Sequence, residues 1–185
     1  MSEAWIGLGS NLDDRRAYLR RAAESLSRLG ETRFSSIYET APVWAPGYSG
    51  PGGKFLNLVC RLQTDLDVVP LLAEMLRIER DNGRVRSDSD SRRTLDLDLL
   101  AFGRVCFTLG QQHRASGPSL ARLPVALDLT VPHPRMHFRP FVLVPMLEID
   151  KTWRHPLLGR TAADLMAGLD QSGVKLHCAC RELFL

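Results

Sequence analysis

Apolar and polar positions alternate or recur in ways that divide the chain into strands and helices. Segments 4–8, 34–40 and 55–62 are predicted strands, and segment 95–99 alternates strictly between leucine and aspartate. Two other segments place apolar residues three or four positions apart, which predicts helices that end near Gly30 and Gly83. We expect Asp13 or Asp14 to cap the first helix and Asp67 the second. A capping box at 161–164 predicts a short last helix.

The predicted order is strand, helix, strand, strand, helix, strand. This order is typical of an α+β protein with a ferredoxin-like sandwich, in which helices pack on a mostly antiparallel sheet. Neither an internal repeat nor a linker is evident, so residues 1–185 are expected to form a single domain. Long loops at 40–53 and 84–93 are candidate active-site loops. Residues 103–122 are expected to be an insertion with little regular structure, and an apolar segment spans 141–147.

The alternating strand places two carboxylates on one face. Asp96 and Asp98 are two residues apart, so their side chains project side by side. Adjacent carboxylates repel, and a protein tolerates them most easily beside a divalent cation or another positive charge. Arginines able to bind phosphate oxygens as forks lie nearby, at positions 84, 86, 92 and 93. The pattern predicts metal-assisted chemistry on a nucleotide, although the spacing alone fits an ordinary solvated strand face equally well.

The composition of the chain limits the kinds of binding partner and the cellular location that we expect. The net charge of +3 and the isoelectric point of about 8.8 fit an anionic small-molecule substrate and give no support for a nucleic-acid partner. The chain has no apolar run of membrane-spanning length and no signal-peptide pattern at its start, so we expect a cytoplasmic protein without a membrane partner. Cys60 and Cys106 are expected core thiols, and the spacing of Cys178 and Cys180 is only a weak zinc signal.

Other motifs limit how a nucleotide or a ring would bind. The segment GLGSN at 7–11 lacks the third glycine of a dinucleotide fingerprint, and the chain contains no P-loop motif. His133 and His137 have the spacing of zinc ligands on a helix, but the prolines around them disfavour a helix there. His133 is therefore interpreted as a hydrogen-bond donor to phosphate. Phe55 and Phe141, together with Asn57, suit a flat heterocycle, because rings stack on it and an amide binds its edge. Each aromatic residue taken singly is more often part of a core.

Six segments in this order resemble the 6-hydroxymethyl-7,8-dihydropterin pyrophosphokinases of folate biosynthesis. They are GLGSNL at 7–12, YETAP at 38–42, FLN at 55–57, IE with GRVR at 78–86, RTLDLD at 93–98, and VPHPRM with Arg139 and Phe141 at 131–141. The resemblance covers most of residues 4–150. It implies a ferredoxin-like fold and an enzyme, an ATP-dependent diphosphokinase. In its reaction ATP transfers its terminal pyrophosphate to the hydroxymethyl group of the dihydropterin, and AMP leaves.

The resemblance also implies roles for individual residues. Asp96 and Asp98 would hold two Mg²⁺ ions on the triphosphate of the co-substrate ATP, and Arg84 and Arg93 would complete the catalytic set by contacting its phosphates. The implied ATP-binding residues are Glu79, Arg84, His133 and Arg139. The implied pterin-binding residues are Thr40, Ala41, Val43, Phe55, Asn57 and Phe141, with the pterin stacked between the two phenylalanines.

The chain departs from the family pattern at four places. The family's R-W-G-P-R before TLDLD reads DSDSRR at 88–93, Phe55 replaces a tyrosine of some members, H-E-R reads HFR at 137–139, and segment 103–123 is longer than usual. Two alternatives therefore stay open: a diverged pterin- or nucleotide-binding module without activity, and a magnesium-dependent transferase for another flat substrate. We expect a monomer, with a dimer as the alternative.

Overall fold

A computed structural model of the chain describes residues 1–42, 53–84, 93–109 and 129–184. Its strands are β1 (Ser2–Ser10), β2 (Glu31–Phe34), β3 (Ile37–Thr40), β4 (Phe55–Thr64), β5 (Asp96–Phe102), β6 (Phe107–Leu109), β7 (Leu129–Val131) and β8 (Lys175–Cys178). Its helices are α1 (Arg15–Leu26), α2 (Val68–Asp81), α3 (Pro140–Ile149) and α4 (Ala162–Met166), with 3-10 helices η2 (Met136–Phe138) and η3 (Cys180–Leu183). None of the helices in these ranges is long and apolar enough to cross a membrane.

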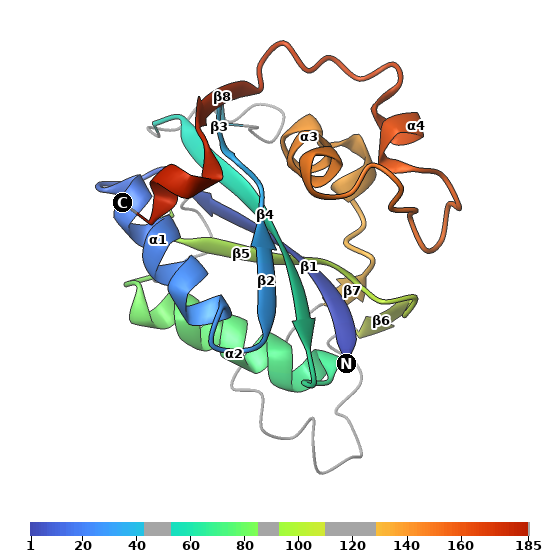
Figure 1. Cartoon of the computed structure of the whole chain (residues 1–185), viewed down its shortest axis with the longest axis horizontal. Helices are drawn as coiled ribbons and strands as arrows, with labels where there is room; N and C mark the ends of the chain where they lie inside the picture. Colours follow the sequence, from blue (N-terminus) through green and yellow to red (C-terminus); the bar gives the residue numbers. More distant parts are fainter. Residues whose placement is uncertain (43–52, 85–92, 110–128, 185) are drawn as a thin grey trace.

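The main sheet is antiparallel and has the order β5-β1-β4-β3-β8, with β2 also paired to β4 (Figure 1). When β2 and β3 are taken together as one interrupted strand, the four principal strands have the order of a ferredoxin-like sandwich. The predicted fold class is therefore confirmed. A separate two-stranded sheet is formed by β6 and β7.

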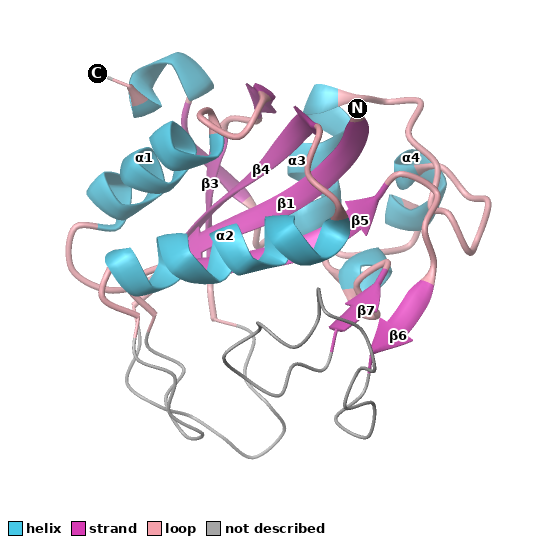
Figure 2. Ribbon diagram, turned by 90° about the horizontal axis from the view of Figure 1, so that it is seen from below, coloured by secondary structure: helices cyan, strands magenta, loops and turns pink. Residues whose placement is uncertain are grey.

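One face of the sheet is covered by α1 and α2 (Figure 2). Strands β1 and β5 send alternate side chains into this core, among them Ile6, Leu8, Leu97 and Leu99, all at most 7% exposed. The alternation arises because successive residues of a strand point to opposite faces. The remaining residues of β5, including Asp96 and Asp98, therefore face the other side.

The second face is only partly covered, by α3 and α4. Trp5 and Val59 pack there with Leu143 and Met146 of α3, and Trp5 also contacts Trp153 at a ring-centroid distance of 5.9 Å. Beyond this second core, β1 continues with glycines at positions 7 and 9. Because these residues carry no side chain, the end of the second face stays open and forms the floor of a cavity.

The strand predicted at 34–40 is two strands, separated at Ser35 and Ser36. The Ser35 backbone N–H donates to the Val59 carbonyl at 2.9 Å, and its hydroxyl oxygen accepts from the Val59 N–H at 2.9 Å. One residue thus satisfies both backbone groups of Val59, so β4 remains paired while the neighbouring strand bends.

Several local predictions can be compared with the structure. Asp14 caps α1 by accepting from the Ala17 N–H at 3.0 Å, and the capping box of α4 is confirmed. Asp67 precedes α2, but its side chain makes no capping hydrogen bond. The core position predicted for Cys106 is wrong, because this thiol lies exposed beside the turn that follows β5, whereas Cys60 is buried. Part of the expected irregular insertion forms β6, and residues 110–128 lie outside the described part of the chain.

Candidate active site

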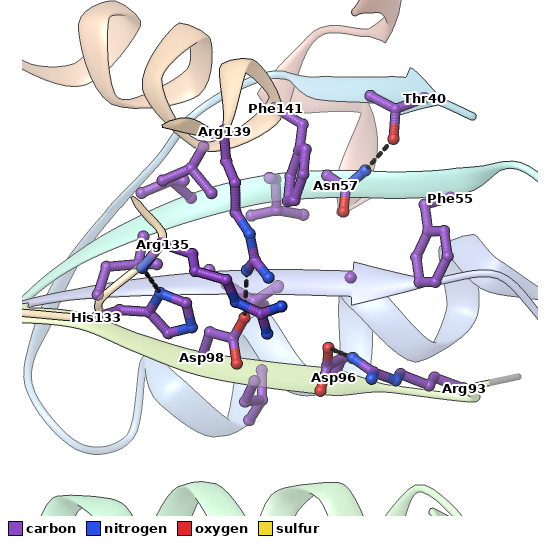
Figure 3. A pocket seen from close by; sticks show the side chains of 18 of the residues that line it. Thr40, Phe55, Asn57, Arg93, Asp96, Asp98, His133, Arg135, Arg139 and Phe141 are labelled. Carbon is purple, nitrogen blue, oxygen red and sulfur yellow. Dashed lines mark hydrogen bonds and ion pairs between the residues drawn. The ribbon is translucent and has the colours of Figure 1, made fainter. Parts of the chain in front are cut away.

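A cavity of about 660 Å³ lies on the open end of the second face. It is bounded by the strands β1, β3, β4 and β5 and by the segment that leads into α3 (Figure 3). Its charged lining residues are Arg84, Arg93, Asp96, Asp98, Arg135 and Arg139, and its other lining residues include Gly7, Gly9, Thr40, Ala41, Phe55, Asn57, His133, Phe138 and Phe141. The cavity thus has a charged end over β5 and an apolar end with one amide.

The two carboxylates at the charged end are unequal. Asp96 accepts hydrogen bonds from the guanidinium groups of Arg84 and Arg93, one on each oxygen. Burial raises the pKa of Asp96, but the two arginines more than offset it and hold that pKa below its usual value. Among the described residues, Asp98 has a single, longer ion pair, with Arg139 at 3.5 Å. Burial and the charge of Asp96 raise the pKa of Asp98 to about 6.

These carboxylates fit a hard divalent cation. Oxygen is the donor that Mg²⁺ prefers, and Mg²⁺ is usually held by one or two carboxylates together with substrate phosphates and water. In the described part of the chain, no group of three or more histidine, cysteine or acidic side chains is arranged to hold a metal. Among the described residues, a cation at this site would therefore have only these two carboxylates as a ligand group. A bound cation would favour the ionised form of Asp98, whose pKa is raised by burial and by Asp96.

Glu79, on helix α2, fixes the position of the Arg84 side chain. The Glu79 carboxylate accepts from Arg84 Nη1 at 2.6 Å and from the Leu97 N–H at 2.9 Å, and its side chain is 3% exposed. Burial lowers the pKa of Arg84, but Asp96 and Glu79 reverse this effect and raise it, so Arg84 is a permanent cation. Glu79 itself does not line the cavity.

Arg93 is fixed at its backbone by Asn11, a residue that the sequence analysis did not single out. The Asn11 Oδ1 accepts from the Arg93 N–H at 2.7 Å, and the Asn11 N–H donates to the Arg93 carbonyl at 3.1 Å. The Arg93 side chain is 40% exposed and extends over Asp96. The signal in the sequence is the turn that follows β1, because asparagine in a turn commonly binds backbone groups.

His133 and Arg139 form the opposite wall of the charged end. The Nδ1 atom of His133 accepts from the Arg135 N–H at 3.1 Å. Burial, together with Arg139 and Arg135, lowers the pKa of His133 to about 4. The ring is therefore neutral at pH 7 with its proton on Nε2, which is a hydrogen-bond donor. Arg139 lies over the Phe141 ring at 5.4 Å and connects the charged end to the apolar end.

The apolar end is built around Asn57, with Phe55 and Phe141 on its two sides (Figure 3). The Asn57 Nδ2 donates to the Thr40 hydroxyl at 2.9 Å, and both residues are buried. This bond orients the amide and leaves its Oδ1 as an acceptor. A Cβ on Gly9 would lie 3.1 Å from this Oδ1 and 3.7 Å from the Phe55 ring, so a side chain at this position would fill the space between them.

Residues 5–151 match the family model described as 7,8-dihydro-6-hydroxymethylpterin-pyrophosphokinase (HPPK). The chain belongs to this family. It is 40% identical over 149 residues to the 2-amino-4-hydroxy-6-hydroxymethyldihydropteridine pyrophosphokinase of Bacillus subtilis, covering 79% of this chain and 77% of the relative. It is 33% identical over 177 residues to the enzyme of the same name from Pseudomonas aeruginosa, covering 95% and 96%.

A solved structure agrees with the fold. The crystal structure of Plasmodium falciparum HPPK-DHPS A437G with STZ-DHP matches with a TM-score of 0.67 and 14% identity. The match covers 90% of this chain and 45% of the Plasmodium chain, so this chain spans less than half of that longer protein. Other relatives carry names that refer to folate synthesis, such as the mitochondrial folate synthesis bifunctional protein of Pisum sativum, at 35% identity.

The structure of this HPPK-family chain brings most of the predicted site residues into one cavity. Those that line it are Thr40, Ala41, Phe55, Asn57, Arg84, Arg93, Asp96, Asp98, His133, Arg139 and Phe141. Val43, Arg86 and Arg92 lie outside the described residues, as does most of the altered loop that precedes Arg93. Phe138, at the position of the family's usual glutamate, lines the cavity and is 62% exposed.

Gly7, Gly9 and Arg135 also line the cavity, although the sequence analysis gave them no role of their own. The two glycines carry a readable signal, since they occupy alternate positions of a predicted strand and therefore share one face. Arg135 follows the His133 turn and had no distinguishing pattern of its own. Its proximity to Asp98 becomes visible only in the folded chain (Figure 3).

Proposed function

We propose that this chain transfers the terminal pyrophosphate of ATP to the hydroxymethyl group of 6-hydroxymethyl-7,8-dihydropterin and releases AMP, as a step of folate biosynthesis. One observation carries the proposal. A single cavity joins a carboxylate pair beside arginines to an amide that lies between two phenylalanines. The first group suits a triphosphate with its metal, and the second suits a flat heterocycle. The family membership supports the same reaction.

At the charged end, Asp96 and Asp98 would hold two Mg²⁺ ions shared with the triphosphate. When bound, these ions neutralise phosphate charge and polarise the phosphorus that is attacked. Arg84 and Arg93, which contact Asp96 in the structure, lie beside the same position and bind phosphate oxygens. Glu79 acts on ATP through Arg84, whose guanidinium it orients.

The opposite wall would bind the rest of the triphosphate. His133 donates a hydrogen bond from Nε2, because its Nδ1 accepts from the Arg135 N–H. Arg139 binds phosphate as a cation. The catalytic effect arises from fixing both reactants and from the charges around the phosphates, because phosphoryl transfer needs little covalent chemistry from the protein.

At the apolar end, the pterin would stack between Phe55 and Phe141. The Oδ1 of Asn57 accepts a hydrogen bond from the pterin edge, while Thr40 holds the amide in this orientation. Backbone groups near Thr40, Ala41 and Val43 bind the remaining edge. Gly9 forms the floor beneath the ring, and the hydroxymethyl group points toward Asp96 and Asp98.

We further propose that residues 1–185 form a single pyrophosphokinase domain that acts as a monomer in the cytoplasm. The cavity is bounded by elements of one chain, so a second copy is not needed to complete it. Light scattering of the purified protein distinguishes a monomer from a dimer.

The test is AMP formation from ATP and Mg²⁺, with and without 6-hydroxymethyl-7,8-dihydropterin. We expect AMP that depends on the pterin in the wild type and is lost in Asp96→Ala. Asp65→Ala, whose carboxylate is 86% exposed, is the matched control and should behave as the wild type. Pterin binding without AMP would favour the non-catalytic binding module, and turnover only with a different acceptor would favour another transferase.

A further inference from the structure

Glu148 fastens the last turn of α3 to the bend between β2 and β3. Its Oε1 accepts from the Ser36 hydroxyl at 2.7 Å, and its Oε2 accepts from the Ser36 N–H at 2.8 Å. The Tyr38 hydroxyl also donates to Oε2, at 3.0 Å. The carboxylate thus binds three donors from two residues of the neighbouring strand segment. Burial and Glu148 together raise the pKa of Tyr38 to about 12, so the phenol stays a donor throughout the neutral range.

The two elements joined by Glu148 carry opposite parts of the apolar end. Helix α3 carries Phe141 in its first turn, and β3 ends at Thr40, which orients Asn57. Tyr38 is also the direct antiparallel partner of Asn57 in the register of β3 and β4. The distance between Phe141 and the Thr40–Asn57 edge therefore depends on how α3 sits against β3.

The remaining contacts of α3 with the sheet do not fix its position along that surface as firmly. Residues Val142, Leu143, Met146 and Ile149 pack into the second core through apolar side chains. Apolar contacts are non-directional, whereas a carboxylate with three donors fixes both distance and orientation. Glu148 thus provides a directional contact between α3 and β3.

We propose that Glu148, with Ser36 and Tyr38, is a positioning residue for the pterin. It sets the distance between Phe141 and the Thr40–Asn57 edge of the cavity. This inference rests on the proposed function, because it assumes that the ring lies between Phe55 and Phe141. None of these three residues lines the cavity, so any effect on the ligand must pass through Phe141, Thr40 and Asn57. The charged end has separate supports, in which Glu79 holds Arg84 and Asn11 holds Arg93.

The test compares substrate dependence in Glu148→Gln, Tyr38→Phe and Ser36→Ala. We expect Glu148→Gln to raise the KM for the pterin about 5- to 20-fold, while the KM for ATP changes by less than about twofold. Tyr38→Phe and Ser36→Ala should change the pterin KM in the same direction by smaller factors. Glu74→Gln is the matched control: its carboxylate is paired with Arg77 on α2, away from the cavity, and should leave both KM values unchanged.

We call the contacts of Glu148 with Ser36 and Tyr38 the clamp. A double variant distinguishes loss of the clamp from general loosening of the fold. If Tyr38 acts through Glu148, adding Tyr38→Phe to Glu148→Gln should change the pterin KM less than it does in the wild type. If Glu148→Gln does not fold, Tyr38→Phe and Ser36→Ala still test the clamp, because each removes one hydroxyl and leaves the carboxylate in place. An unchanged pterin KM in all folded variants, or equal losses for both substrates, would overturn the inference.

Equilibrium binding distinguishes failure of this inference from failure of the proposed function. Pterin binding to each variant is followed by fluorescence titration without ATP. If the wild type binds the pterin but forms no AMP, the proposed function fails, and a pterin Kd raised in Glu148→Gln still supports the clamp. If the wild type is active and the pterin Kd is unchanged in Glu148→Gln, the clamp alone fails.

Discussion

Asp96 and Asp98 lie on the same face of β5, yet their pKa values are displaced in opposite directions. Two arginines hold the pKa of Asp96 low, whereas burial and the neighbouring Asp96 raise that of Asp98 to about 6. Among the described residues, Asp96 is paired closely with two arginines, whereas Asp98 has one longer ion pair, with Arg139. Such a difference within a pair of titratable groups is typical of functional sites.

The raised pKa of Asp98 should make the free energy of unfolding depend on pH. The unfolded chain titrates an aspartate near pH 3.9, so the folded protein holds the Asp98 proton more tightly and loses stability as the pH rises from about 4 to about 6. Asp98→Asn removes that loss. Since the side chain is 38% exposed, we expect a modest gain of about 1 kcal/mol at pH 7 without Mg²⁺ and little difference at pH 4.

Urea unfolding of both proteins in EDTA at the two pH values measures the effect. Asp65→Asn, at a carboxylate that is 86% exposed, serves as the control and should show no such gain. A variant that is less stable than the wild type at pH 7 would show that the Asp98 carboxylate supports the fold.

Replacing Glu79 should cost stability, because its buried carboxylate binds both Arg84 and the Leu97 N–H. We expect Glu79→Ala to lower the free energy of unfolding by about 2–4 kcal/mol, since it leaves buried donors without an acceptor. Glu74→Ala removes a more exposed partner of Arg77 and should cost less than about 1 kcal/mol. Equal losses in thermal or urea unfolding would contradict the buried role of Glu79.

A methyl group on Gly9 should impair pterin binding without unfolding the protein. The added Cβ would lie 3.1 Å from Asn57 Oδ1, closer than an ordinary contact, so the amide must shift from the position in which Thr40 holds it. We expect Gly9→Ala to weaken pterin binding at least about tenfold, and to change the free energy of unfolding by less than about 1 kcal/mol. Gly7→Ala is the comparison, because its Cβ would meet Leu100 at an ordinary 3.6 Å. Fluorescence titration with the pterin distinguishes the two; equal affinities would contradict the placement of the ring over Gly9.

The backbone contact between Asn11 and Arg93 should matter for turnover. Asn11→Ala removes the 2.7 Å bond to the Arg93 N–H, so Arg93 is held less precisely over Asp96. We expect kcat to fall about tenfold, with a smaller change in pterin affinity. Asn11→Asp retains an acceptor oxygen and should recover part of the rate. Steady-state kinetics of the two variants measure this, and equal rates for both would argue against the hydrogen bond as the cause.

The fold and the charged end were predictable wherever a local pattern decides which way a residue points. The alternation at 95–99 placed Leu97 and Leu99 in the core and the two aspartates in the cavity, because the side-chain period of a strand is fixed. The resemblance to the family added further cavity residues, such as Thr40, Ala41 and Arg139. It also assigned Glu79 to ATP binding, whereas the structure places this carboxylate outside the cavity, as the buried partner of Arg84.

Features set by contacts between distant residues could not be predicted. The bend at Ser35 depends on its two hydrogen bonds with Val59, and the clamp joins Ser36 and Tyr38 to Glu148, more than 100 positions away. Cys106 has apolar neighbours in the sequence, which led to the prediction of a core thiol. The thiol is exposed because the residue lies beside a turn. Pairing of the chain end with β3 through β8 carried no recognisable signal either.

The most direct test of the central claim is the identity of both products in one reaction. ATP, Mg²⁺ and 6-hydroxymethyl-7,8-dihydropterin are incubated with the protein, and the products are separated by chromatography and weighed by mass spectrometry. We expect AMP and a pterin carrying two phosphoryl groups in equal amounts, and neither product with Asp96→Ala. Formation of ADP in place of AMP, or AMP without a modified pterin, would contradict pyrophosphoryl transfer by this site.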